Sequence, residues 1–294
     1  MTDKYHLKYI HNKATTKIQE LYGVPYLTFP KLSEYERDVI HGFSTRLGGV
    51  SHDHLASMNL SFSRGDEREN VLENHRRFAA VLGYDEKRLV FSDQVHLTNF
   101  HKVTQADCGK GIIRESDIKE IDGLVTNIPG IPIITFYADC VPLFFYDPVK
   151  KVIAMAHSGW RGTVERIGAK MVSYMHTEYG SEPFDIICAV APSICQSCYE
   201  VSEDVAEQFF SVFGKDNGDE LLYRKKNDKY QLNLHKACEI TLLEAGILPE
   251  HLDVTDLCTC CNPDFFYSHR ASGGKRGNLA GVMMLKEECE CLGN

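Results

Sequence analysis

The segment 136–163, FYADCVPLFFYDPVKKVIAMAHSGWRGT, carries a thiol and an imidazole at the outer ends of two apolar runs. Cys140 opens the first run and His157 closes the second. A thiolate and an imidazole can hold one metal ion together, or the imidazole can take the thiol proton and leave a nucleophile. The placement of these two residues therefore indicates either a metal site or nucleophilic catalysis.

The turn between the two runs decides whether the two side chains meet. Asp147 and Pro148 suit the first two positions of a type I turn. A two-residue loop at 148–149, or a four-residue loop at 147–150, places Cys140 directly opposite His157. Directly opposed residues share a face, with Cβ atoms about 4.5–5.5 Å apart. The sequence therefore predicts a cross-strand pair.

A third ligand is available in SDQVHLTNF, which follows the run RLVFS at 88–92. Gln94 and His96 alternate after that run, so both side chains are expected on one side. His96, Cys140 and His157 would supply two nitrogens and one sulfur and leave a fourth position open, which is typical of catalytic zinc. The same set can also hold copper.

Four further residues are candidates for binding a substrate. Arg161 in SGWRGT precedes a predicted helix, where backbone N–H groups favour an anion. Arg46 in STRLGG is a second candidate for binding an anion. Asp139 either orients a ligand, moves a proton or caps the backbone. Phe43 either stacks on a planar ligand or packs in the core.

A second group of cysteines could bind a structural metal. CQSC at 195–198 is a half-site of the form C-x-x-C, whereas CTCC at 258–261 is interpreted as an irregular C-x-C-C sequence. Together they could supply four thiolates to zinc, or they could remain reduced thiols. The residues concerned are Cys195, Cys198, Cys258, Cys260 and Cys261.

Hydrophobic periodicity places these motifs on a mixture of helices and strands. Helices are predicted at 66–83, 163–180, 202–214 and 233–246. Strands are predicted at 88–92, 123–127, 131–136, 141–146, 152–157, 185–191 and 279–285. Because strands occur both in adjacent pairs and between helices, we expect an α+β fold with mixed β-sheets layered with helices. One catalytic domain at 26–294 would follow an N-terminal extension at 1–25.

Composition excludes several classes of function. The chain has 294 residues and a net charge of −9, which argues against a nucleic-acid polymer as partner. No apolar run approaches the roughly 18–20 residues of a membrane span. The first residues lack the apolar core of a secretory signal, so a cytoplasmic location is expected. Eleven cysteines, an odd count, favour reduced thiols or metal ligands over a disulfide scaffold.

The motifs are similar, in their order, to those of the YfiH-like family, also called the laccase-domain or polyphenol-oxidoreductase family. The sequences that carry the resemblance are HGFSTRLGGVS (41–51), QVH (94–96), DGLVT (122–126), ADCVPL (138–143), HSGWRGT (157–163), CYEV (198–201) and FFYSHR (265–270). The resemblance extends from about residue 40 to residue 285.

The resemblance implies a YfiH-like sandwich with a zinc site at His96, Cys140 and His157, copper being the alternative metal. It also implies phosphorolysis of adenosine, inosine, guanosine and methylthioadenosine by inorganic phosphate, with adenosine deamination as a second activity. Two departures stand out. Leu97 replaces a glycine that commonly follows QVH, and SHRAS retains Arg270 where the family commonly has paired arginines.

Other functions remain open on the residues alone. A copper polyphenol oxidase would use the same ligands for redox chemistry. A metal-free hydrolase would use Cys140 as nucleophile and His157 as base. A non-enzymatic binding module is a further alternative. The H-x-E and P-C-x-x-C signature of cytidine-type deaminases is absent, so a deaminase activity would need a different framework.

Overall fold

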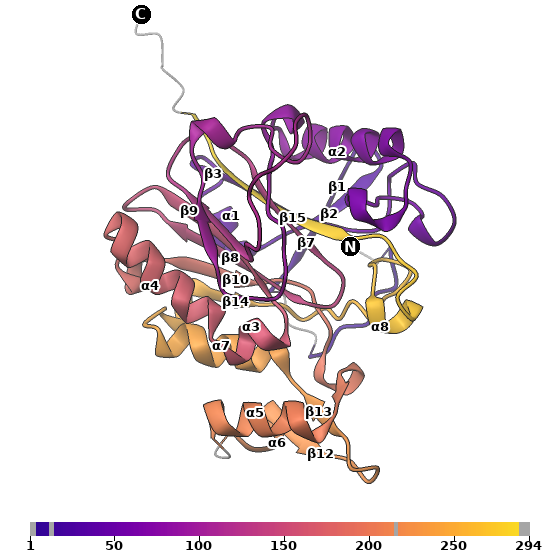
Figure 1. Cartoon of the computed structure of the whole chain (residues 1–294), viewed down its shortest axis with the longest axis vertical. Coiled ribbons are helices and arrows are strands. Elements are labelled where there is room, and N and C mark those ends of the chain that lie inside the picture. Colours follow the sequence, from indigo (N-terminus) through magenta and orange to yellow (C-terminus); the bar gives the residue numbers. More distant parts are fainter. Residues whose placement is uncertain (1–3, 12–14, 215–216, 288–294) are drawn as a thin grey trace, which may run out of the picture.

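Two six-stranded sheets stacked face to face form the centre of the chain, with helices on both outer faces (Figure 1). The computed structural model describes residues 4–11, 15–214 and 217–287. The predicted α+β fold with mixed sheets layered with helices is confirmed.

The first sheet combines strands from both ends of the sequence. Its order is β1 (Lys17–Leu21), β2 (Val24–Thr28), β3 (Val39–Ser44), β15 (Leu279–Leu285), β7 (Ile133–Tyr137) and β4 (Val90–Phe91). Strand β1 lies inside the segment expected as an N-terminal extension, and it forms an edge strand of this sheet.

The second sheet carries the predicted hairpin at its centre. Its order is β14 (Leu252–Val254), β10 (Ile187–Val190), β8 (Val141–Asp147), β9 (Val152–Ser158), β6 (Gly123–Thr126) and β5 (Phe100–Lys102). A small third sheet consists of β11 (Glu200–Val201), β13 (Tyr230–Leu232) and β12 (Leu222–Arg224).

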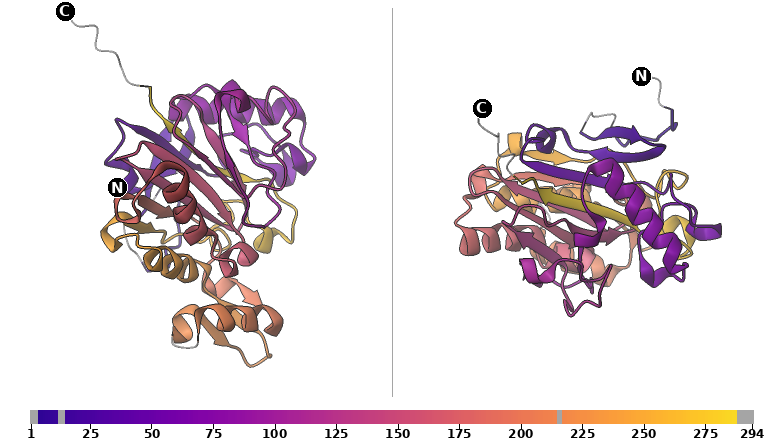
Figure 2. Two further views of the ribbon diagram at one scale, coloured as in Figure 1. Left: turned by 60° about the vertical axis from the view of Figure 1, so that its left-hand side comes forward. Right: turned by 90° about the horizontal axis from the view of Figure 1, so that it is seen from above.

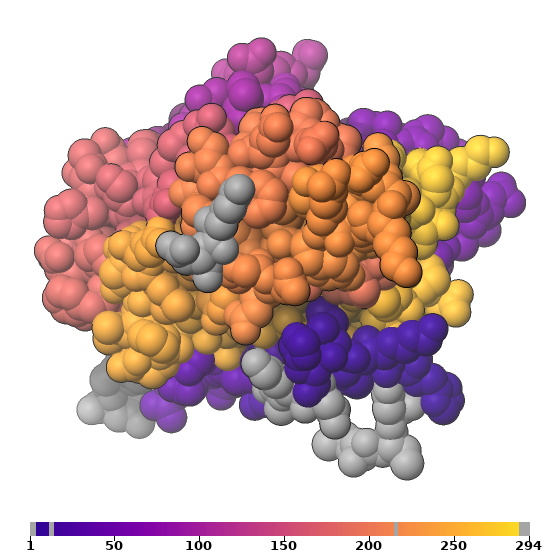
Figure 3. Space-filling model, turned by 90° about the horizontal axis from the view of Figure 1, so that it is seen from below, coloured from indigo at the N-terminus to yellow at the C-terminus, as the bar shows by residue number. Residues whose placement is uncertain are grey.

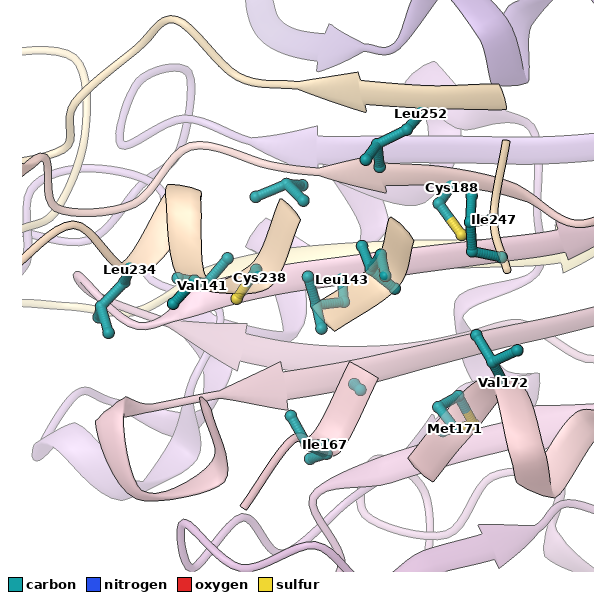
Figure 4. Packing of buried hydrophobic residues seen from close by; sticks show 14 of the residues in the cluster. Val141, Leu143, Ile167, Met171, Val172, Cys188, Leu234, Cys238, Ile247 and Leu252 are labelled. Atoms are coloured by element: carbon teal, nitrogen blue, oxygen red, sulfur yellow. The ribbon is translucent and has the colours of Figure 1, made fainter. Parts of the chain in front are cut away.

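Side-chain alternation along β8 shows how the layers pack. Val141, Leu143 and Phe145 face the helices, whereas Phe144 and Tyr146 lie between the two sheets. The helices on this outer face are α4 (Ile167–Tyr179) and α7 (Leu234–Glu244), and Figure 4 shows their apolar side chains against the sheet. On the opposite face of the molecule, α2 (Arg68–Leu82) covers the first sheet. The alternation is what a strand buried on both faces requires.

Three of the four predicted helices correspond to single helices: α2, α5 (Glu203–Phe213) and α7. The helix predicted at 163–180 is instead two helices, α3 (Trp160–Val164) and α4. Arg166 separates them in a left-handed conformation at φ 60°. The remaining helices are short: α1 (Pro30–Ser33), α6 (Gly218–Leu221) and α8 (His269–Ser272). None of the helices that the structure describes is both long and apolar enough to cross a bilayer.

The third sheet and α5 and α6 form a lobe beside α7, at the lower end of the molecule in Figure 1. Figure 1 and the left panel of Figure 2 both place this lobe at the lower end of the molecule. Seen from below in Figure 3, it occupies the middle of that face, with the N-terminal residues at its border. The chain enters the lobe through the segment that contains the CQSC sequence.

The β8–β9 hairpin has a different register from the predicted one. Pro142, not Cys140, lies opposite His157. The predicted cross-strand pair is therefore wrong by two positions, and Cys140 precedes the first paired residue of β8. Cys140 and His157 are diagonal neighbours rather than direct partners.

The loop explains the shift in register. Pairing continues to Asp147 and Val152, so the loop is residues 148–151. The Asp147 Oδ1 accepts hydrogen bonds from the backbone N–H groups of Val149 (2.8 Å) and Lys150 (3.0 Å). Lys151 closes the loop in a left-handed conformation at φ 53°. The loop therefore has two residues more than the predicted loop at 148–149, and it lies one position later than the predicted loop at 147–150. Either difference moves the partner of each β8 residue by two positions.

Candidate metal centre and active site

His96, Cys140 and His157 lie together, with one ligand atom from each within 4.8 Å of the others. The Cys140 Sγ is 3.8 Å from the His96 Nε2, and the two imidazole rings meet edge-on with centroids 4.8 Å apart. His157 comes from β9, Cys140 from the residue before β8, and His96 from the loop after β4. The structure thus brings the three expected ligands to one point in spite of the changed register, because diagonal neighbours also share a face.

Asp122 fixes the orientation of two of these residues. Its buried carboxylate accepts the His157 Nδ1–H at 2.8 Å, so the Nε2 of His157 is left for a ligand. It also accepts the backbone N–H groups of Val95 (3.1 Å), His96 (3.0 Å) and Leu97 (2.8 Å). One carboxylate therefore positions both the His157 ring and the loop that carries His96.

The sequence reasoning missed Asp122. Its available signal was an acidic residue at the start of DGLVT, directly before the fully buried strand β6. A carboxylate in such a place requires several hydrogen-bond donors, and the backbone of 95–97 supplies three of them.

The close packing of the three ligands depends on a glycine. A Cβ on Gly159 would lie 2.7 Å from the His96 Cδ2 and 3.4 Å from the Cys140 Sγ. His96 itself has a left-handed backbone conformation, at φ 67°, which turns its ring toward this point. The glycine of SGWRGT therefore provides the space in which the His96 ring lies.

Cys140 and His157 shift each other's protonation. Burial raises the pKa of the Cys140 thiol, but the neighbouring His157 and His96 outweigh burial and lower this pKa to about 6. Burial lowers the pKa of His157, but the Cys140 sulfur and the Asp122 carboxylate raise it to about 9. The thiolate of Cys140 is therefore favoured near neutral pH. The thiolate is the form that binds a metal or attacks a carbon.

A cavity of about 360 Å³ opens on one side of the three ligands and contains two arginines, Arg64 and Arg276. Burial lowers the pKa of Arg276 to about 10, and its Nε has no hydrogen-bond partner. Within the described parts of the chain neither guanidinium forms an ion pair. Lys119 and Asp93 also line the cavity. Two unpaired guanidinium groups in one hollow are suited to an anion with several oxygens.

A second cavity, of about 430 Å³, meets the first at His96 and Cys140. Trp160 and Tyr199 supply aromatic surface to its wall, and Arg161 contributes a charge. The Arg161 guanidinium lies 4.3 Å from the centre of the Trp160 ring. The three ligands therefore stand where an arginine-lined hollow joins a hollow with aromatic walls.

Asp139 lines the second cavity, and Arg270 contacts Asp139 from the loop behind. The Asp139 carboxylate accepts the Thr259 hydroxyl at 2.6 Å and the backbone N–H of Arg270 at 2.7 Å. The Arg270 guanidinium donates to the carbonyls of Cys198 and Glu200, both at 3.1 Å. Both side chains thus connect the loops that surround the site.

The other expected substrate-binding residues lie differently. The Arg46 guanidinium donates to the carbonyls of Ala56 and Pro263 and does not line either cavity. Phe43 is fully buried between the two sheets. Gln94 lines the first cavity with His96, and its amide forms two hydrogen bonds with the backbone of Phe136, at 2.7 and 2.8 Å.

Sequence reasoning also missed Arg64, Arg276 and Tyr199 as residues of the site. Arg276 lies in ASGGKRGN, a glycine-rich segment without hydrophobic periodicity. The signal available in the sequence was Gly277, beside Arg276. In the structure a Cβ at this position would lie 2.7 Å from the Tyr267 ring, because the loop passes close to the body of the protein. No spacing in the sequence connects Arg64 with Arg276, because 211 positions separate them.

Comparisons with known proteins establish the family of the chain. The family described as "Multi-copper polyphenol oxidoreductase laccase" matches residues 40–286. The chain is 35% identical to the protein named purine nucleoside phosphorylase YlmD of Bacillus subtilis, over 96% of this chain and 99% of that protein. The crystal structure of the hypothetical protein YfiH of Bacillus licheniformis has a TM-score of 0.85 at 32% identity, covering 92% of this chain and 99% of that one. The structure of YlmD from Geobacillus stearothermophilus also has a TM-score of 0.85, at 31% identity, covering 93% and 99%. The chain therefore belongs to the laccase-like family of YfiH and YlmD, whose named relatives include purine nucleoside phosphorylases.

Proposed function

We propose that this chain is a zinc-dependent purine nucleoside phosphorylase, acting on adenosine, inosine, guanosine and methylthioadenosine, with adenosine deaminase activity. Inorganic phosphate is the second substrate. The observation that carries the proposal is the placement of His96, Cys140 and His157 where the arginine-lined cavity meets the cavity with aromatic walls. The names of the relatives, purine nucleoside phosphorylase, support the same reaction.

The donor set suits zinc. Catalytic zinc is commonly bound by imidazoles and a thiolate, and this site offers two imidazoles and one thiolate. A carboxylate that orients a ligating histidine, as Asp122 orients His157, is also typical of such sites. A copper electron-transfer site would add a weak axial ligand such as methionine, and neither cavity has a methionine among the described residues that line it. A zinc ion here would act as a Lewis acid and lower the pKa of a bound water to near 7, as adenosine deamination requires.

Phosphate fits the arginine-lined cavity. Arg64 and Arg276 would bind its oxygens and hold it beside the ligand cluster. The purine would lie in the second cavity against Trp160 and Tyr199, which places the ribose near His96 and Cys140. A phosphate oxygen then forms a bond to C1′ while the C1′–N9 bond breaks, and the purine leaves with the electron pair. Holding both reactants in adjoining hollows favours this exchange.

A second function has one observation in its favour. Cys140, His157 and Asp122 form a thiol–imidazole–carboxylate chain, with the imidazole held at 2.8 Å by the carboxylate. This arrangement is suited to a metal-free hydrolase with Cys140 as nucleophile. The two functions differ in their use of metal. Zinc should protect Cys140 from iodoacetamide in a metalloenzyme, whereas a hydrolase would be alkylated equally with and without zinc.

Incubation of the purified protein with inosine and phosphate tests the proposal. We expect hypoxanthine and ribose 1-phosphate in equal amounts, no turnover without phosphate, and loss of turnover in Cys140→Ala. Cys108→Ala is the matched control, because Cys108 is also half-buried and does not line either cavity. Release of free ribose, or turnover that does not depend on phosphate, would contradict phosphorolysis. Oxygen uptake with a phenol and bound copper would point instead to the polyphenol oxidase.

A further inference from the structure

A second metal-capable cluster lies outside the site described above. Cys195, Cys198, Cys258 and Cys261 place their sulfur atoms within 4.8 Å of one another. The Sγ atoms of Cys195 and Cys261 are 3.9 Å apart, and those of Cys198 and Cys261 are 3.4 Å apart. Four thiolates around one zinc ion, each about 2.3 Å from it, stand about 3.8 Å from one another. The observed separations are therefore those of a single tetrahedral ion.

The spacing of the four cysteines is also that of a zinc site. Cys195 and Cys198 form one C-x-x-C half-site, and Cys258 and Cys261 form a second one, so that Cys260 lies between the ligands of the second half-site. The sequence left open which cysteines of CTCC take part, and the structure brings Cys258 and Cys261 into the cluster. Two C-x-x-C half-sites distant in sequence and adjacent in space are typical of structural zinc.

Two backbone N–H groups are directed at one sulfur of the cluster. The N–H groups of Cys195 and Cys261 both point at the Cys258 Sγ, at 3.2 and 3.4 Å. The two half-sites are held side by side by a β-bridge between Ser193 and Cys258. A disulfide is a poorer fit, because one disulfide would leave two of the four sulfurs without a partner.

We infer that these four cysteines bind a structural zinc ion, which closes the wall of the second cavity and fixes the root of the lobe. Three contacts connect the cluster with the site. Thr259, inside the second half-site, donates to Asp139, and Arg270 donates to the carbonyl of Cys198. Tyr199, which lines the cavity, directly follows the first half-site. The ion holds together two loops that no strand ladder joins beyond one bridge.

Metal analysis of protein purified from zinc-supplemented cells tests this inference without any substrate. In His157→Ala, which removes a ligand of the first site, we expect one zinc ion per chain to remain. X-ray absorption on this variant should show four sulfur neighbours at about 2.3 Å. A zinc ion with nitrogen neighbours, an iron ion, or no retained metal would overturn the assignment.

Single substitutions identify the ligands. Cys195→Ser and Cys261→Ser should each lose one zinc ion per chain, whereas Cys260→Ser, the adjacent control, should keep it. If the variants do not fold, alkylation of the unmutated protein provides the test. The four cysteines should resist iodoacetamide until a strong chelator is added, as read by peptide mass spectrometry. Alkylation without chelator, or a disulfide among the four, would overturn the inference. Because no measurement uses a nucleoside, failure here is distinct from failure of the proposed function.

Discussion

The Asp122 carboxylate lies 2.8 Å from the His157 Nδ1 and accepts the N–H groups of three consecutive residues in the loop of His96. Each of its two oxygens receives two donors. Two ligands from distant parts of the chain are thus placed relative to each other by one side chain. This relationship explains why the ligand cluster forms although the hairpin register is not the predicted one.

Asp122→Asn should weaken metal binding by about 10–100-fold, the usual effect of removing a carboxylate behind a ligating histidine. The amide of asparagine presents an NH₂ group to two donors. Either the N–H groups of Val95 and Leu97, or the N–H of His96 and the His157 ring, then lose their acceptor. Zinc affinity measured by competition with a chromophoric chelator reads the effect. Asp117→Asn, on an exposed carboxylate, is the control. Equal affinities in the two variants would contradict the positioning role of Asp122.

Gly159→Ala should displace the His96 ring, because the new Cβ would lie 2.7 Å from its Cδ2. We expect loss of turnover and of metal from the His96 site, with little change in the overall fold. Gly162→Ala is the matched control, since its Cβ would meet its nearest neighbour at an ordinary 3.5 Å and the position is helical. Activity and metal content of the two variants give the comparison. Similar losses in both would mean that crowding at His96 is not the cause.

Arg276→Gln and Arg64→Gln should raise the KM for phosphate by about tenfold or more, since a hydrogen bond to a charged group contributes about 1.5–3 kcal/mol. The KM for inosine should change far less, because in the proposed arrangement the purine lies in the other cavity. Arg37→Gln, on an exposed arginine that lines neither cavity, is the control. Initial rates at varied phosphate and fixed inosine provide the test. A larger effect on inosine than on phosphate would reverse the assignment of the two cavities.

Acid should destabilise the fold between pH 6.5 and pH 4 through three buried histidines. Burial lowers the pKa of His41, His75 and His235 from 6.5 to about 4. Their contribution is fully present above pH 6.5, and it falls as the pH drops because only the unfolded chain takes up these protons. Each histidine lowers the free energy of unfolding by about 1.4 kcal/mol per pH unit in this window.

Urea unfolding at several pH values measures this loss. His41→Gln keeps an acceptor for the N–H of Phe29, which His41 Nε2 accepts at 3.0 Å, but removes the titration. The free energy of unfolding of this variant should fall less steeply below pH 6.5 than that of the unmutated protein. Parallel curves would show that His41 does not titrate on unfolding.

The sequence was sufficient for elements with strong periodicity. The seven predicted strands all occur, because their apolar runs are buried on one or both faces of a sheet. Short edge strands such as β1 and β12 were missed, since KIQEL is mainly exposed and LYR has only three residues, so that neither carries a clear pattern. The break at Arg166 was missed because nothing in its neighbours distinguishes a left-handed residue from a helical one.

The residues of the candidate site divide in the same way: the candidate ligands could be selected from the sequence, whereas the groups that support them could not. Residue type and motif order were enough to select His96, Cys140 and His157. The supporting groups could not be found in this way, because Asp122, Arg64 and Arg276 meet the ligands only through tertiary packing. The predicted hairpin register was wrong because the loop is residues 148–151, and the diagonal arrangement preserved the pair because a shift of two positions keeps the same face.

Trp160, the only tryptophan of the chain, lies half-buried in the wall of the second cavity. All indole fluorescence of the protein therefore originates at one known point, a short distance from His96 and Cys140. In the proposed arrangement, a purine that stacks against this ring would quench the emission directly. Phosphate that binds in the arginine-lined cavity would leave the emission unchanged. The molecule thus carries its own optical reporter, which can separate the arrival of the base from the arrival of phosphate in a stopped-flow experiment without any attached dye.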